Sequence, residues 1–172
     1  ADDGSAQVSL PFNWFFYGAT YSNLYIGTNG YLSFGAASTA YQAVAIPAAT
    51  APNNYIALCW SDLNPGSAGT ISYGTVGTAP NRVFVVDFNG VAFYNASGSI
   101  ATGQVCLFED GHVEIHATTL DPGTSTAASV MGIENATGSS GTPVTGRNGG
   151  TWSVTAPEAW SFIPAYPVFS YS

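Results

Sequence analysis

The chain has 172 residues and a net charge of -8, and only 7% of its residues are charged, against about 25% in ordinary soluble domains. It has no lysine, and Arg82 and Arg147 are its only cations, so we expect no nucleic acid partner and no lysine-containing phosphate loop. An acidic, lysine-free chain rich in Ser and Thr is typical of exported proteins, which predicts a secreted or cell-surface location. The sequence lacks the run of about 18 apolar residues that membrane insertion requires.

Short apolar runs alternate with glycine and proline along the chain, which contains 20 Gly and 10 Pro. This pattern predicts an all-β fold, and we expect one domain over residues 1–172 that forms a two-sheet antiparallel β-sandwich, jelly-roll-like, with long loops and little helix. The alanine-rich segment 36–51 predicts a loop with at most one helical turn. The predicted strands are Gln7–Leu10, Asn13–Tyr17, Leu24–Gly27, Tyr31–Phe34, Tyr55–Trp60, Thr70–Tyr73, Arg82–Phe88, Gly103–Glu109, His112–His116, Ser129–Ile133 and Trp160–Ile163.

Two of these strand pairs predict hairpins with a definite register. In LYIGTNGYLSFG, residues 24–35, the Asn29-Gly30 pair suits a two-residue type I′ turn and sets Tyr25 opposite Phe34. Both faces of that hairpin are largely apolar, so we expect it to be covered on both sides.

The second hairpin is predicted over residues 103–116, with Asp110-Gly111 as its type I′ turn. This register sets Phe108 opposite Val113 and Cys106 opposite Ile115 on a core face. The other face then carries Glu109, His112, Glu114 and His116 together with Val105 and Leu107.

Cys59 and Cys106 are the only cysteines, and their separation excludes CxxC metal or redox motifs. Two alternatives remain open from the sequence, a disulfide between strands and a pair of buried thiols.

Several phrases, taken in order, resemble those of the nidogen-like extracellular domain. The phrases are VSLPFNWFFYGATYSNLYIGTNGYLSFG, IALCWSDLNPG, GTISYGTV, VFVVDFNGVAFY, GQVCLFEDGHVEIH and VMGIENATG, which together cover residues 8–138. The resemblance implies a β-sandwich-like module of secreted and cell-surface adhesive proteins, associated with adhesion and assembly and without catalytic residues.

Metal sites are predicted at two places. Alternate strand residues project from one face, so His112, Glu114 and His116 form either a zinc-ligating set or an ordinary solvated face. Calcium would find hard oxygen ligands at Asp62 and Asn64, or at Asp2-Asp3, whereas Asn64-Pro65-Gly66 also suits a simple turn that Asp62 helps to stabilise.

Ligand-binding residues are expected in loops, where rigid scaffolds usually carry them. Trp152 lies in the glycine-rich GRNGGTWSV and is the preferred exposed aromatic for stacking on a sugar, with Arg147 and Asn148 beside it and Asn64 in the second candidate loop. No catalytic residue is predicted, because no G-x-S-x-G motif is present and only two histidines are available.

These patterns predict a non-catalytic extracellular adhesion module that recognises a glycan or a cell-surface or matrix protein through end loops. The alternative is a structural fibre or surface-assembly subunit that acts by self-association as a homo-oligomer. A surface with so few charged residues has little charge repulsion to prevent self-association. A glycoside-hydrolase type of enzyme ranks third. No cofactor is expected apart from the calcium just described. The opening ADDGSAQ has no signal region, which indicates either that a signal was removed or that this is a piece of a larger protein. The ending, which has no polar tail, favours the excised piece.

Overall fold

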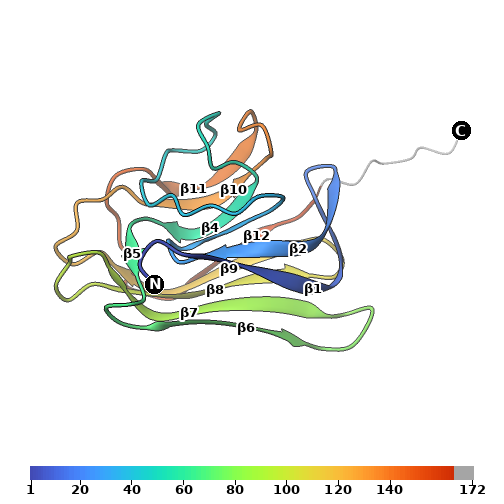
Figure 1. Ribbon diagram of the computed structural model, residues 1–172, viewed down its shortest axis with the longest axis horizontal. Helices are drawn as coiled ribbons and strands as arrows, with labels where there is room; N and C mark the ends of the chain where they lie inside the picture. The colour runs from blue at the N-terminus through green and yellow to red at the C-terminus, as the bar shows by residue number, and fades with distance from the viewer. Residues whose placement is uncertain (165–172) are drawn as a thin grey trace, which may run out of the picture.

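Two antiparallel sheets face each other in the computed structural model, which describes residues 1–164 (Figure 1). One sheet has the strand order β1-β2-β3-β4-β10-β11, and the other has the order β12-β9-β8-β7-β5, in which β6 also pairs with β7. The strands are β1 Ser5–Phe16, β2 Ala19–Gly27, β3 Tyr31–Ser33, β4 Tyr55–Trp60, β5 Leu63–Asn64, β6 Thr70–Val76, β7 Val83–Phe93, β8 Ile100–Phe108, β9 Val113–Asp121, β10 Val130–Glu134, β11 Gly141–Asn148 and β12 Glu158–Phe162.

The predicted all-β sandwich is confirmed, and residues 1–164 contain no helix. Accordingly, no helix in this part of the chain is long and apolar enough to cross a membrane. The alanine-rich segment 36–51 is a loop, as predicted. The strands predicted at Gln7–Leu10 and Asn13–Tyr17 form the single strand β1, which has a register shift between Ser9 and Trp14. Neither β5 nor β11 was predicted.

The main core lies between the two sheets and takes apolar side chains from both. Trp14 is fully buried, stacks on Phe34 with 5.3 Å between ring centroids, and donates its indole N–H to the Phe108 carbonyl at 3.1 Å. A second cluster around Tyr31 and Trp60 packs against side chains of the 36–51 loop. The loop therefore covers the outer face of the first sheet, as the two-sided apolar pattern of residues 24–35 predicted.

Both predicted hairpin registers are wrong by one residue. Gly27 pairs with Tyr31 in the first hairpin, and Leu107 pairs with Val113 in the second. In the second hairpin the Phe108 N–H also donates to the His112 carbonyl at 3.0 Å. Each turn therefore has three residues, 28–30 and 109–111, and ends on a glycine with positive φ, 81° at Gly30 and 98° at Gly111. A loop with a left-handed glycine in its third position is the next most common hairpin connection after the two-residue turns.

The register error exchanges the faces of β8, because successive strand residues point to opposite sides of a sheet. Val105 and Leu107 are fully buried in the core between the sheets, whereas Cys106 shares the outer face with Glu114, its cross-strand partner.

Of the two alternatives for the cysteines, the disulfide is wrong and the pair of buried thiols is confirmed, because Cys59 and Cys106 are both buried and free. Cys59 belongs to the core between the sheets, on the other side of β8 from Cys106. Burial raises the pKa of the Cys59 thiol to about 12 and that of the Cys106 thiol to about 11, so neither is a ready nucleophile.

Candidate functional site

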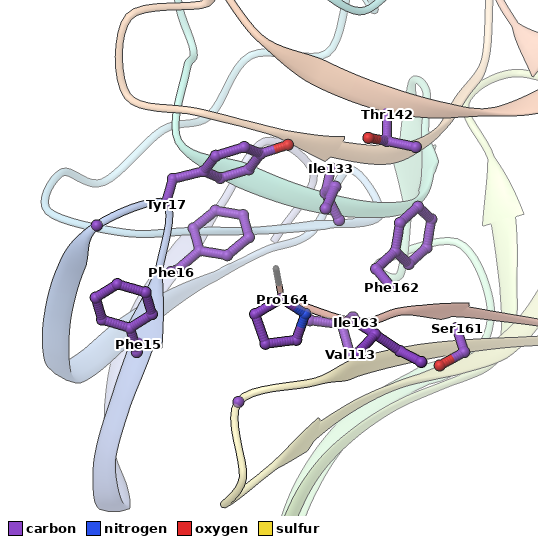
Figure 2. A pocket seen from close by; sticks show the side chains of 12 residues that line it. Phe15, Phe16, Tyr17, Val113, Ile133, Thr142, Ser161, Phe162, Ile163 and Pro164 are labelled. Carbon is purple, nitrogen blue, oxygen red and sulfur yellow. The ribbon is translucent and has the colours of Figure 1, made fainter. Parts of the chain in front are cut away.

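An apolar groove of about 660 Å³ opens where the β1–β2 turn meets the ends of β9, β11 and β12 (Figure 2). Its volume is in the range of ligand pockets in proteins. The side chains that line it come from both sheets and include Phe15, Tyr17, Ile133, Thr142, Phe162 and Ile163. Two of these aromatic side chains are open to solvent, since Phe15 is 50% exposed and Tyr17 is 41% exposed.

The β1–β2 turn places Tyr17 at the groove in an unfavourable backbone conformation. Phe16 pairs with Ala19, so Tyr17 and Gly18 form a two-residue turn with φ angles of 46° and 89°, as in type I′. The left-handed region suits Gly, Asn or Asp, and it is costly for an aromatic residue. Strain of this kind clusters at functional sites, so the side chain of Tyr17 is a candidate for a binding role.

The polar groups of the groove are neutral hydroxyls. The Tyr17 hydroxyl points toward Thr142, and Ser161 lies on the β12 side (Figure 2). Burial raises the pKa of Tyr17 more than its hydrogen bond with Thr142 lowers it, so the hydroxyl stays protonated. Within residues 1–164 no Asp, Glu, Lys or Arg lines the groove, so it suits an uncharged ligand.

The sequence missed this groove because it forms between segments far apart in the chain. The FYG of LPFNWFFYG was one available signal, since a Tyr-Gly pair between two strand patterns predicts a tight turn that carries an aromatic side chain.

Three of the predicted ligand residues lie at the end of β11, but their polar groups are already engaged. Arg147 pairs with Glu158 at 3.2 Å and lies over the ring of Trp152, 5.2 Å from its centroid. Trp152 is half-buried and donates its indole N–H to the Ser129 carbonyl at 2.8 Å, so the expectation of an exposed aromatic is wrong. Asn148 bonds both the N–H and the carbonyl of Ile46, each at 2.8 Å.

The fourth predicted ligand residue, Asn64, lies on β5 in the other sheet. Its Oδ1 accepts the Gly66 N–H at 2.8 Å, and its carbonyl accepts the Ser67 N–H. Asn64 therefore stabilises the turn that its sequence context suggested. Asp62, the other member of the predicted calcium pair, belongs to a group of converging carboxylates.

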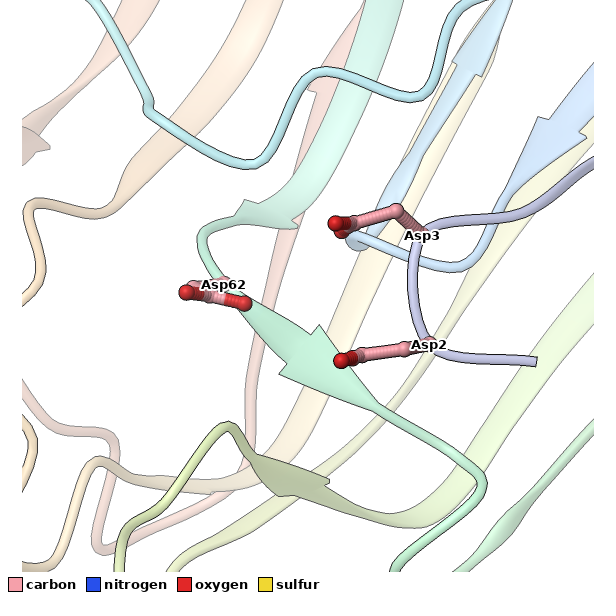
Figure 3. Close-up of side chains that lie close together, drawn as sticks. All are labelled: Asp2, Asp3 and Asp62. Carbon is pink, nitrogen blue, oxygen red and sulfur yellow. The ribbon is translucent and has the colours of Figure 1, made fainter.

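Asp62 instead meets the two N-terminal acids (Figure 3). One carboxylate oxygen from each of Asp2, Asp3 and Asp62 lies within 4.8 Å of the others. Asn29 donates its amide N–H to Asp3 Oδ1 at 2.9 Å, while the buried Asp2 Oδ1 has no hydrogen-bond partner within residues 1–164. Burial, followed by the charges of Asp3 and Asp2, raises the pKa of Asp62.

This carboxylate cluster has the chemistry of a hard-cation site, because calcium takes carboxylate oxygens as ligands. Neither arginine neutralises it, since Arg82 pairs with Glu109 and Arg147 with Glu158. The sequence offered Asp62 with Asn64, or Asp2-Asp3, for calcium, and the structure brings Asp62 of the first alternative together with Asp2 and Asp3 of the second.

The His112, Glu114 and His116 set shares one side of β9, as the sequence predicted, but the rings face carboxylates. His116 Nε2 lies 2.8 Å from Glu114 Oε2, and His112 Nδ1 lies 2.5 Å from Asp110 Oδ1. His112 also stacks on Phe108 with 3.8 Å between ring centroids. Within residues 1–164 the three ligand atoms do not converge as those of the aspartate cluster do.

Comparison with known proteins identifies the family. The profile described as NIDO related matches residues 1–165. The chain belongs to the NIDO-related family. The nidogen-like resemblance is thereby confirmed, and the match extends past residue 138, where the family-like phrases end.

Alpha-tectorin is similar to this NIDO-related chain in two organisms. The protein of Mus musculus is 29% identical over 134 residues and that of Homo sapiens is 28% identical over 134 residues, in each case covering 64% of this chain. The chain spans only 6% of the length of either relative. No solved structure matches.

Proposed function

We propose that this NIDO-related chain is a non-catalytic extracellular adhesion module that binds a neutral glycan, or an apolar surface of a matrix protein, in the groove at the β1–β2 turn. Family membership supports the extracellular setting, and the absence of lysine agrees with it. The groove has two exposed aromatic rings, whereas Asn64 and Trp152 use their polar groups within the fold.

The observation that carries the proposal is the pair of exposed rings beside hydroxyl groups in an uncharged groove. Sugar rings have apolar faces that stack on aromatic side chains, and their hydroxyls bond polar groups at the rim. Phe15 and Tyr17 supply the aromatic surface, and Thr142 and Ser161 supply the hydroxyls. A sulfated or phosphorylated ligand would need a cation, which the lining lacks. Of the two ligand classes, this chemistry favours the neutral glycan.

Binding without catalysis is supported by the way the titratable groups are used. The rings of His112 and His116 bond Asp110 and Glu114. Both thiols are buried with raised pKa. A nucleophile with an adjacent base is the usual signature of covalent hydrolysis, and these contacts do not form it.

A glycan array probed with the 172-residue chain tests the proposal. We expect binding to one or more neutral sugars, loss of that signal in Phe15→Ala, and an unchanged signal in Tyr41→Ala, which removes another exposed ring away from the groove. Binding that survives Phe15→Ala would place the ligand elsewhere. If no sugar binds while immobilised matrix proteins retain the wild-type chain and not Phe15→Ala, the ligand is a protein and the glycan assignment is overturned.

A further inference from the structure

Strand β6 is an edge strand with almost no cover. It pairs only with β7, along Thr70–Val76, and six of its seven residues are exposed. Tyr73 and Val76 are each 58% exposed. Figure 1 shows β6 at the border of its sheet, beside β7. A long exposed edge offers unpaired backbone N–H and C=O groups, which are a template for another strand.

Proteins normally protect such edges with proline, bulges, charge or short strands, and the other long edges here are protected in this way. Strand β1 has Pro11 and a register shift, and β11 has Pro143, Arg147 and a register shift. Strand β12 has only five residues and begins at Glu158. Strand β6, with the sequence TISYGTV, has no charge and no proline, and it pairs with β7 without a register shift. It is the one long edge among residues 1–164 that lacks these devices.

We propose that β6 is a self-association surface, on which the β6 strand of a second copy pairs antiparallel about a two-fold axis at Tyr73. This register is the only one that pairs all seven residues of both strands. It sets Tyr73 against its own copy, Ser72 against Gly74, Ile71 against Thr75 and Thr70 against Val76. Every pair is uncharged, so no like charges meet, and β-branched residues face each other at the flanks.

A second copy fits this edge better than a charged partner does. Residues 70–76 offer no charged side chain for a partner to recognise, and the nearest acid on β7, Asp87, is bonded by the Gln104 amide at 2.8 Å. The net charge of -8 per chain makes two copies repel each other at long range. At physiological ionic strength, salt screens this repulsion beyond a Debye length of about 8 Å. Association through β6 therefore strengthens as salt is raised, the opposite of an ion-paired interface.

Sedimentation equilibrium of the 172-residue chain over a concentration series tests the surface. The proposed interface is a single pair of β6 strands and is therefore small, so we expect a dissociation constant on the order of 0.1 mM. Tyr73→Lys sets two cations directly opposite each other and should weaken association by about tenfold or more. Tyr73→Thr, which also loses the contact with the Phe84 ring, should associate nearly as wild type does, and so should Tyr41→Lys, which places the same charge away from β6.

Cross-linking tests the register. Directly opposed Cα atoms lie about 4.5–5.5 Å apart, within the range that a disulfide spans, so Tyr73→Cys should form a covalent dimer under mild oxidation. The matched variant Thr75→Cys should not, because in this register the two Cα atoms are about 14 Å apart. Both native thiols are buried. The proposal is overturned by a monomer throughout the series to about 1 mM, by Tyr73→Lys associating as wild type does, or by equal cross-linking of the two cysteine variants. None of these outcomes tests ligand binding in the groove, so the β6 proposal and the proposed function can fail independently.

Discussion

Replacing Tyr17 by asparagine should separate stability from binding at the groove. The left-handed conformation at φ 46° costs an aromatic residue about 1–2 kcal/mol, whereas asparagine is favoured at this position of a type I′ turn. Against that gain, the variant loses the edge contact with Phe16, at 4.8 Å between centroids, which contributes about 0.5–1.5 kcal/mol. It also loses the hydrogen bond with Thr142, which contributes about 0.5–1.5 kcal/mol. The gain and the losses largely cancel, so we expect the free energy of unfolding to change by less than about 2 kcal/mol, and the melting temperature by less than about 8 °C.

Binding should respond differently, because the Tyr17 ring and hydroxyl both face the groove. We expect the glycan signal of Tyr17→Asn to fall by about tenfold or more, which corresponds to about 1.4 kcal/mol. Tyr41→Asn is the matched control, since Tyr41 is 43% exposed and does not line the groove, and it should change neither quantity. A loss of more than about 2 kcal/mol of stability in Tyr17→Asn would show that the ring is held for packing. Undiminished binding would refute the functional interpretation of the strained turn.

Three further predictions concern titratable groups outside the groove. Burial raises the pKa of Glu134 in the folded protein. The stability that this carboxyl contributes is therefore complete below its pKa in the unfolded chain, and is lost as the pH rises through its pKa in the folded protein. The gain in stability of Glu134→Gln over wild type, measured by urea unfolding, should thus be larger at pH 7 than at pH 4. Calcium at about ten times its Kd should raise the melting temperature of the wild-type chain by about 3–6 °C and leave Asp62→Asn unchanged, and an equal shift in both would exclude the aspartate cluster. A reducing agent should not alter the melting temperature, because Cys59 and Cys106 are free thiols.

The sandwich could be predicted from the sequence because it depends on local signals. Runs of β-branched and aromatic residues between glycines and prolines indicate strands wherever they occur, and the order of family-like phrases gave the same answer. Strand β11 was missed for the converse reason. Its sequence GTPVTGRN has one buried apolar side chain, Val144, and contains a proline and an internal glycine, so its pairing with β10 is a consequence of tertiary context.

The two register errors have one physical cause. Asn-Gly and Asp-Gly are the strongest signals for a two-residue turn, but here Asn29 and Asp110 are the middle residues of three-residue loops. Packing decides between a two-residue and a three-residue loop, because the three-residue loop of the second hairpin places Val105 and Leu107 in the core between the sheets. Pattern alone could not decide, because both faces of these strands carry apolar residues.

The candidate sites were the least predictable part, because each one is assembled from distant segments. Asn29, in the β2–β3 turn, bonds both Asp3 and the backbone N–H of Leu63, the residue after Asp62, and so helps to bring Asp62 to the N-terminal acids. The same asparagine that was first interpreted as a turn signal thus holds two parts of the cluster together. A single sequence shows which side chains can bind a cation or a sugar, but which of them meet depends on long-range pairing. Long-range pairing here forms the aspartate cluster and the Tyr17 groove, which are the better candidate sites. Trp152 and Asn148 are poorer candidates, because their polar groups form hydrogen bonds within the fold.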